Sequence, residues 1–117
     1  MIGSITVHYG MRWGLRSVKQ YFTLVPMIVS FAHKGLSELF EKGKSSKVQP
    51  ALAARALRRL DAIDAAKTPE ALNVPGFDFH PLRGKPKRYS VHVNGPWCIT
   101  FEWEGENALK LDLENCH

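Results

Sequence analysis

Polar side chains that can carry chemistry fall on one face of a predicted β-sheet in the C-terminal half of the chain. Three segments there alternate apolar with polar residues, which is the pattern of a strand with one buried face. Because the apolar face must pack on a core, we expect the polar face to contact solvent or a ligand. The residues expected on this face are His80, Ser90, His92, Cys98, Thr100 and Glu102.

A cluster of positive charge follows the first of these segments and contains Arg83, Lys85, Lys87 and Arg88, whereas carboxylates gather nearer the C-terminus. The charge is therefore polarised along the chain, although the formal net charge is only +5. Such a cluster suits contact with a polyanion. It is also explained by a solvated loop beside an acidic hairpin, and charge alone favours that second interpretation.

Two helices are predicted ahead of the sheet. Leu36, Leu39 and Phe40 recur at helical spacing and predict a helix over 33–41 that ends at Gly43. Pro50 suits the first turn of a second helix that extends to about Ala66. The expected buried stripe of this second helix is Leu52, Ala56, Leu57, Leu60 and Ile63. A short helical turn is predicted over 68–72.

The arginines of the second helix, Arg55, Arg58 and Arg59, fall mostly off the predicted stripe. We therefore expect them to be exposed and paired with Asp61 and Asp64.

Strands are predicted at 27–31 and, after Pro75 and Gly76, around 77–80, 89–93, 97–103 and 108–113. Asn94 with Gly95 predicts one tight turn between these strands, and Gly105 predicts another. The resulting expectation is an α+β fold in which two N-terminal helices pack on one face of an antiparallel sheet.

Length and composition allow one compact domain, since the chain has 117 residues of which 44% are apolar. No apolar run approaches the roughly 18 residues of a membrane span, and basic residues interrupt every candidate core of a secretory signal. Two cysteines are too few for a disulfide framework and lack the spacing of a zinc site. We therefore expect a cytoplasmic protein with no metal site and no contact with a membrane.

The first 26 residues differ in character from the rest. They carry Arg12, Arg16 and Lys19 but no acidic residue, and they show no periodicity. Met27 would itself serve as a start residue. Two hypotheses follow: a functional basic extension over 1–26, or upstream sequence included by an early initiation codon. The lack of internal consistency favours the second.

Short motifs occur in a fixed order from residue 27 to the end of the chain. They are Met-Ile-Val-Ser-Phe from residue 27, His-Lys-Gly-Leu from 33, Leu-Phe-Glu-Lys-Gly from 39, Leu-Asp from 60, Ala-Ala from 65, His-Pro-Leu-Arg-Gly from 80, Tyr-Ser-Val from 89, Val-Asn from 93, Trp-Cys-Ile-Thr-Phe from 97, and His117. This series resembles the HigB-type toxins of the RelE/ParE superfamily. The resemblance covers 27–117, which we therefore expect to form the toxin domain.

The resemblance implies two helices on a curved antiparallel sheet and a toxin–antitoxin function. Such toxins are endoribonucleases without metal or cofactor that cut messenger RNA on the ribosome, and a HigA-like helix-turn-helix antitoxin neutralises them. The ribose 2′-hydroxyl attacks the adjacent phosphate, so the protein must move protons and stabilise negative charge.

Carried over by position, the resemblance implies that His80 and His117 are catalytic and that Arg83 contacts the phosphate. Histidine suits proton transfer and arginine suits phosphate binding. Lys85, Lys87 and Arg88 are expected to bind the RNA backbone, with His92 as a further RNA contact.

Three family positions are altered. Cys98 occupies the place of an arginine in Trp-Arg-Ile-Thr-Phe, while Asn115 and Cys116 replace the first two residues of Asp-Tyr-His. The alternative function is therefore an impaired toxin that binds its antitoxin and helps to regulate the operon. A gyrase poison of the ParE type is a third hypothesis.

In the family, the positions of Cys98 and Cys116 border one cleft. The resemblance thus raises the hypothesis that the two thiols approach each other and respond to oxidant. Two inert thiols are the other hypothesis, which a reducing cytosol favours.

Overall fold

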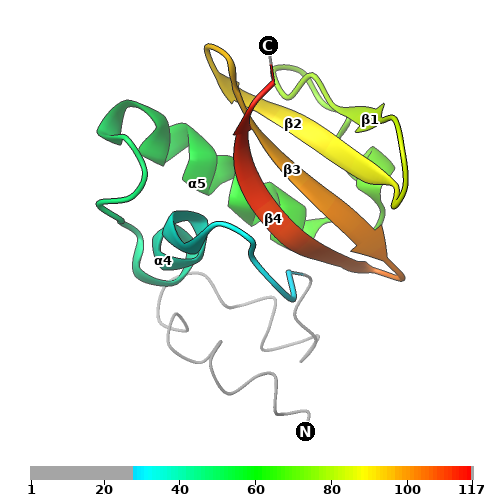
Figure 1. Cartoon of the computed structure of the whole chain (residues 1–117), viewed down its shortest axis with the longest axis horizontal. Helices are drawn as coiled ribbons and strands as arrows, with labels where there is room; N and C mark the ends of the chain where they lie inside the picture. The colour runs from blue at the N-terminus through cyan, green and yellow to red at the C-terminus, as the bar shows by residue number, and fades with distance from the viewer. Residues whose placement is uncertain (1–27, 117) are drawn as a thin grey trace, which may run out of the picture.

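The computed structural model describes residues 28–116, which form two helices followed by a four-stranded antiparallel sheet (Figure 1). The elements in chain order are helices α4 (Lys34–Lys42) and α5 (Pro50–Ala65), the 3-10 helix η2 (Pro69–Leu72), and strands β1 (His80–Leu82), β2 (Arg88–Asn94), β3 (Trp97–Glu104) and β4 (Asn107–Asn115). The hypotheses about residues 1–26, and the positions of Met27 and His117, lie outside the described residues.

Both predicted helices are confirmed, and their ends have identifiable causes. His33 caps the start of α4, because its Nδ1 accepts a hydrogen bond from the Leu36 N–H at 3.2 Å. Gly43 ends α4 in the left-handed conformation with φ 83°, and its N–H donates to the Leu39 carbonyl. Pro50 occupies the first turn of α5, where its missing N–H costs no intrahelical bond.

The four strands form a meander in the order β1-β2-β3-β4, as the alternating pattern predicts. Short turns at 95–96 and 105–106 join the last three strands. The register of β3 with β4 shifts between Thr100 and Glu102, and Lys110 there adopts φ 56°.

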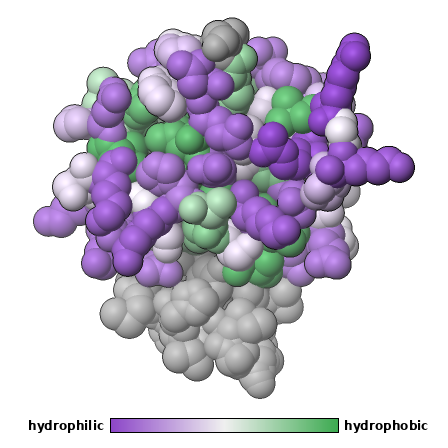
Figure 2. All heavy atoms as spheres, viewed as in Figure 1, coloured by the Kyte–Doolittle hydropathy of each residue, from purple (hydrophilic) through white to green (hydrophobic). Residues whose placement is uncertain are grey.

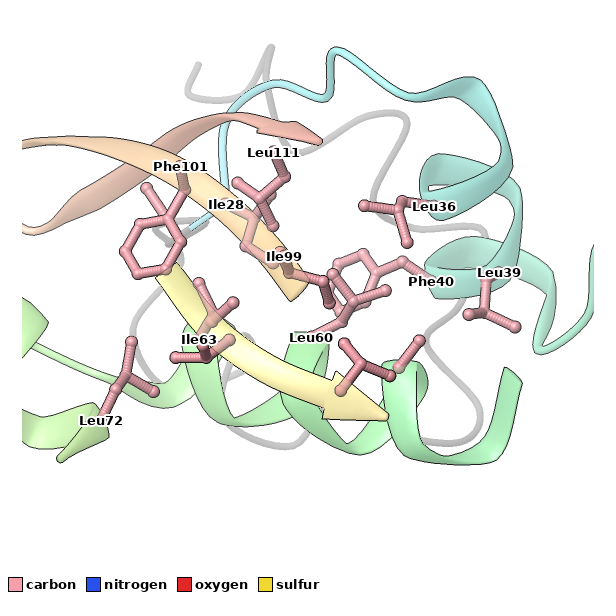
Figure 3. Packing of buried hydrophobic residues seen from close by; sticks show 14 of the residues in the cluster. Ile28, Leu36, Leu39, Phe40, Leu60, Ile63, Leu72, Ile99, Phe101 and Leu111 are labelled. Atoms are coloured by element: carbon pink, nitrogen blue, oxygen red, sulfur yellow. The ribbon is translucent and has the colours of Figure 1, made fainter. Parts of the chain in front are cut away.

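One core lies between the helices and one face of the sheet (Figure 3). Its largest side chains come from every layer, namely Leu36, Leu39 and Phe40 of α4, Leu60 and Ile63 of α5, and Ile99, Phe101 and Leu111 of the sheet. In Figure 1 the sheet lies in front of α5, so the face of the sheet that points away from α5 is left for polar residues. The expected packing of both helices on one side of the sheet is confirmed.

Hydrophilic residues cover most of the molecular face seen in the same view (Figure 2). Within the described residues, no helix combines the length and hydropathy needed to cross a bilayer.

The predicted strand at 77–80 is wrong before His80. Asp78 has φ 46°, and the Phe77 N–H donates to the Val74 carbonyl, so the chain turns here instead of extending. The alternation of Phe77 and Phe79 with polar residues has another cause. Phe77 lies under the Arg59 guanidinium, and the ring of Phe79 stacks on Tyr89 at 5.7 Å, so both rings are partly buried without a strand.

The predicted strand at 27–31 is replaced by two isolated parallel bridges to β4, from Ile28 to Ala108 and from Phe31 to Leu111. Backbone hydrogen bonds run in both directions between this segment and β4. The Val29 N–H donates to the Ala108 carbonyl, and the Leu111 N–H donates to the Ser30 carbonyl. Lys110, which lies between these two contacts, has φ 56°, and its N–H donates to the Ser30 hydroxyl.

Candidate active site on the polar face of the sheet

Rows of directly paired residues cross the face of the sheet that the helices leave free, and we call this surface the polar face. Cross-strand partners point to the same side of a sheet. The rows are His80, Ser90, Thr100 and Asp112; His92, Cys98 and Glu114; and Arg88 with Glu102. The face predicted from alternation is therefore confirmed.

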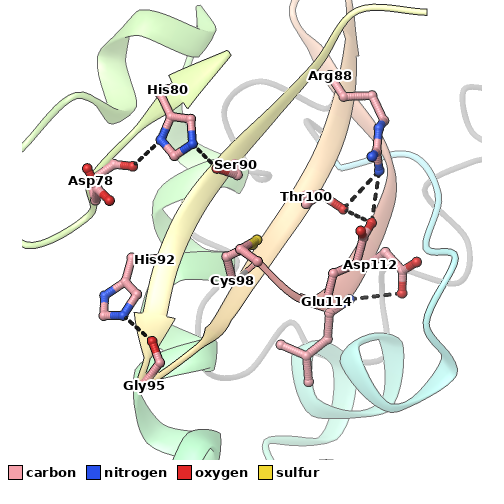
Figure 4. The surroundings of a disulfide bond; sticks show 12 residues. Asp78, His80, Arg88, Ser90, His92, Gly95, Cys98, Thr100, Asp112 and Glu114 are labelled. Carbon is pink, nitrogen blue, oxygen red and sulfur yellow. Dashed lines mark hydrogen bonds and ion pairs between the residues drawn. A yellow bond between two sulfur atoms is a disulfide. The ribbon is translucent and has the colours of Figure 1, made fainter. Parts of the chain in front are cut away.

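The imidazole of His80 is oriented by two contacts (Figure 4). Its Nδ1 lies 3.0 Å from the carbonyl oxygen of Asp78, and a carbonyl can only accept, so Nδ1 carries a proton. Its Nε2 lies 3.4 Å from the hydroxyl oxygen of Ser90. In the neutral ring Nε2 is then the basic nitrogen, and the exposed His80 presents it at the surface.

A pocket of about 110 Å³ opens beside His80, and it is lined by Asp78, His80, Ser90, His92, Cys98 and Cys116. The His92 Nε2 donates to the Gly95 carbonyl at 3.0 Å, which fixes that ring at the far side of the pocket. Two imidazoles and a hydroxyl therefore converge on one small hollow, an arrangement that can accept and return protons. Within residues 28–116, no cluster of three or more His, Cys, Asp or Glu side chains is placed to hold a metal ion.

The turn that carries Asp78 is held by Arg59, which corrects the expectation of an exposed arginine. Arg59 is 7% exposed. Its Nε donates to the His92 carbonyl at 2.9 Å, one Nη donates to the Gly76 carbonyl at 3.0 Å, and its guanidinium lies 4.4 Å from the centre of the Phe77 ring. Burial lowers the pKa of Arg59, with Arg55 and Arg58 adding repulsion.

Helical spacing could have identified this residue. Arg59 lies three residues after Ala56 and seven after Leu52, so it falls on the buried stripe of α5. Arg55 and Arg58 are exposed, as expected.

Arg88 lies on the polar face but is engaged within the protein. Its Nη1 contacts Glu114 at 2.8 Å and Thr100 at 3.4 Å, and the Thr100 hydroxyl donates to the same Glu114 carboxylate. The Thr100 hydrogen bond, with a further contribution from Arg88, holds the pKa of Glu114 below its ordinary value. This ion pair was not predictable from the sequence, because Arg88 and Glu114 are 26 residues apart.

Glu114→Gln is expected to destabilise the protein only above acidic pH. A carboxylate whose pKa is lower in the folded state stabilises that state above its unfolded pKa of about 4.3, and this stabilisation is lost as the pH falls through the folded value. Urea unfolding at pH 7 should therefore separate the variant from the wild-type chain, and the difference should become smaller as the pH is lowered below about 4. An equal difference at both pH values would contradict this assignment.

The two cysteines are joined, because Cys98 of β3 and Cys116, just past the end of β4, form a disulfide in the pocket wall. The structure confirms that the two cysteines approach each other, and it contradicts the hypothesis of two separate thiols.

The basic cluster lies at the end of the β1–β2 hairpin. Arg83, Lys85 and Lys87 are exposed, and none of them lines the pocket. Arg83 follows His80 by three residues, which is roughly 10 Å at the rise of a strand.

The structure thus brings together His80, His92, Cys98 and Cys116, and leaves Arg83 and the lysines at one side. Asn115, also expected at the site, is exposed at the end of β4, and His117 is outside the described residues.

Comparison with known proteins adds two findings. Residues 29–115 match the family described as the RelE-like toxin of the type II toxin–antitoxin system HigB. The chain is also 42% identical over 92 residues to the protein named Endoribonuclease HigB from Proteus vulgaris, an alignment that spans 78% of this chain and 100% of the relative.

Proposed function

The chain belongs to the HigB-like family of RelE-like toxins of type II toxin–antitoxin systems, and we propose that it is an endoribonuclease that cuts messenger RNA on the ribosome. The proposal extends the activity named for the Proteus vulgaris relative to this chain. It includes a RelE/ParE-like fold for the toxin domain at 27–117 and action in the cytoplasm. Its partner is an antitoxin, which we propose to be of the HigA-like helix-turn-helix type.

The observation that carries this proposal is the oriented imidazole of His80 at the pocket. With Nδ1 protonated against the Asp78 carbonyl, Nε2 can remove the proton from a ribose 2′-hydroxyl. The resulting oxygen attacks the neighbouring phosphorus, and the 5′-oxygen of the next nucleotide leaves. His117 is proposed as the acid that protonates this leaving oxygen.

Charge stabilisation is assigned to the exposed cations of the β1–β2 hairpin. In residues 28–116, Arg83, Lys85 and Lys87 have no ion pair, so their charges are available to RNA phosphates. Arg88 is proposed to contribute less, because Glu114 already neutralises it. His92 is proposed as an RNA contact at the far wall of the pocket.

Induced expression of the full chain, with and without its antitoxin, tests the function. Growth should stop only without antitoxin, and cellular messenger RNA should be lost within the same interval. Arrest with DNA damage and intact messenger RNA would instead support a gyrase poison.

Arg83→Gln is expected to slow cleavage by about 10²-fold, as for loss of one preorganised charge near a phosphate. The exposed Lys44, in the loop between α4 and α5, offers a control that removes the same formal charge. Cleavage of a defined message in a purified translation system should fall for Arg83→Gln and be unchanged for Lys44→Gln. Equal rates for the two variants would remove Arg83 from the phosphate site.

A second candidate function is an impaired toxin that only binds its antitoxin and regulates the operon. The observation favouring it is that, among the described residues, no lysine or arginine lines the pocket, whose wall includes Cys98. Absence of growth arrest, together with antitoxin binding by the purified chain, would support this candidate.

A further inference from the structure

We propose that Cys98 and Cys116 are a reversible thiol–disulfide pair, and that formation of the bond increases the activity of the adjacent site. This inference rests on the proposed nuclease function, because the bond lies in the wall of the same pocket. Figure 4 shows Cys98 between the row of His80 and Ser90 and the group formed by Arg88, Thr100 and Glu114.

The backbone places the two cysteines for bonding without rearrangement. Their Cα atoms are 6.1 Å apart, within the range of about 4.4–6.8 Å found for disulfides. Cys98 is paired in register with Glu114, and the Cys116 N–H donates to the Pro96 carbonyl at 2.8 Å. These backbone contacts bring the segment that carries Cys116 beside β3.

Unequal burial assigns a role to each thiol. Cys116 is exposed, whereas Cys98 is 3% exposed. The oxidant is a low-molecular-weight disulfide such as oxidised glutathione. The Cys116 thiolate attacks one of its sulfurs and expels one thiolate, and the Cys98 thiolate then attacks Cys116 Sγ and expels the second. Two protein thiols are oxidised, and one external disulfide is reduced to two thiols.

The bond changes the pocket in two ways. It replaces two groups that can ionise to thiolates by one neutral group, which removes a source of repulsion for a phosphate. It also ties to β3 the residue that directly precedes His117 in the sequence. Proton transfer depends on the position of the group that transfers the proton, which is here the proposed acid His117. We therefore expect the oxidised chain to cut RNA on the order of tenfold faster than the reduced chain.

The test uses the full chain equilibrated in glutathione buffers from fully reduced to fully oxidised. Free thiols are counted first, and the chain has no cysteine besides these two. The count should fall from two to zero. Cleavage of ribosome-bound messenger RNA is then measured in each buffer and should rise as the thiol count falls.

Two variants separate the steps. In Cys98→Ser, the exposed Cys116 should accumulate as a mixed disulfide with glutathione, visible by mass spectrometry. In Cys116→Ser, the buried Cys98 should react little, and cleavage should equal that of the reduced wild-type chain in every buffer.

A chain that keeps two free thiols in every buffer, or that cuts equally fast with zero and two thiols, would overturn the inference and leave the nuclease function intact. A chain that forms the bond but cuts RNA in no buffer would refute the nuclease function, and with it the proposed effect on activity.

Discussion

His80→Ala is expected to lower the rate of messenger RNA cleavage by about 10²–10⁴-fold, the usual contribution of a positioned acid or base. The substitution removes the ring that the Asp78 carbonyl and the Ser90 hydroxyl orient at the pocket. Because His80 is exposed, stability should change by less than about 0.5 kcal/mol. Cleavage of a defined message by the full chain in a purified translation system measures the rate, and thermal unfolding checks the fold.

His33→Asn is the matched control for loss of an imidazole. His33 caps α4, and asparagine also accepts a hydrogen bond at such a position, so the helix keeps its cap. Cleavage by this variant should equal that of the wild-type chain. If His80→Ala also cut at the wild-type rate while remaining folded, His80 would not be the proton acceptor.

Arg59→Met is expected to destabilise the protein by about 2–4 kcal/mol, since hydrogen bonds from a charged donor contribute roughly 1.5–3 kcal/mol each. The variant keeps an apolar stem of similar length against Phe77, but the bonds to the His92 and Gly76 carbonyls are lost. These bonds tie the turn before β1 to helix α5 and strand β2. Urea unfolding measures the loss in free energy.

Arg58→Met on the same helix provides the comparison, because Arg58 is exposed and its loss should cost less than about 0.5 kcal/mol. Arg59→Met should also slow cleavage under conditions where it remains folded, because the Asp78 carbonyl would no longer be fixed against His80. Equal stability of the two variants would show that Arg59 does not anchor the turn.

Periodicity predicted most of the fold, because most elements have a single apolar face. Leu36, Leu39 and Phe40 identified α4, and the alternation of Tyr89, Val91 and Val93 identified β2. The prediction failed where aromatic rings are buried by something other than a sheet.

The turn at 77–79 is the clearest case of that failure. Phe77 is covered by a guanidinium, and Phe79 is covered by Tyr89. No local pattern distinguishes these contacts from strand packing, since both place an aromatic ring at every second position.

The site was predictable only in part. Alternation placed His80, Ser90, His92 and Cys98 on one face, and the resemblance singled out His80 among them. The Asp78 carbonyl that fixes the His80 ring was not predictable, because it depends on a backbone turn with positive φ. Likewise, the Glu114 that neutralises Arg88 belongs to a strand that is not its neighbour in the sheet.

The chemical ends of the RNA fragments test the central claim most directly. If the His80 imidazole removes the proton from a 2′-hydroxyl that then attacks the phosphate, the fragments carry a 2′,3′-cyclic phosphate at one new end and a 5′-hydroxyl at the other. The full chain should produce these fragments on ribosomes. The His80→Ala variant should not produce them in the same interval. Fragments with 3′-hydroxyl and 5′-phosphate ends, or identical fragments from the variant, would contradict it.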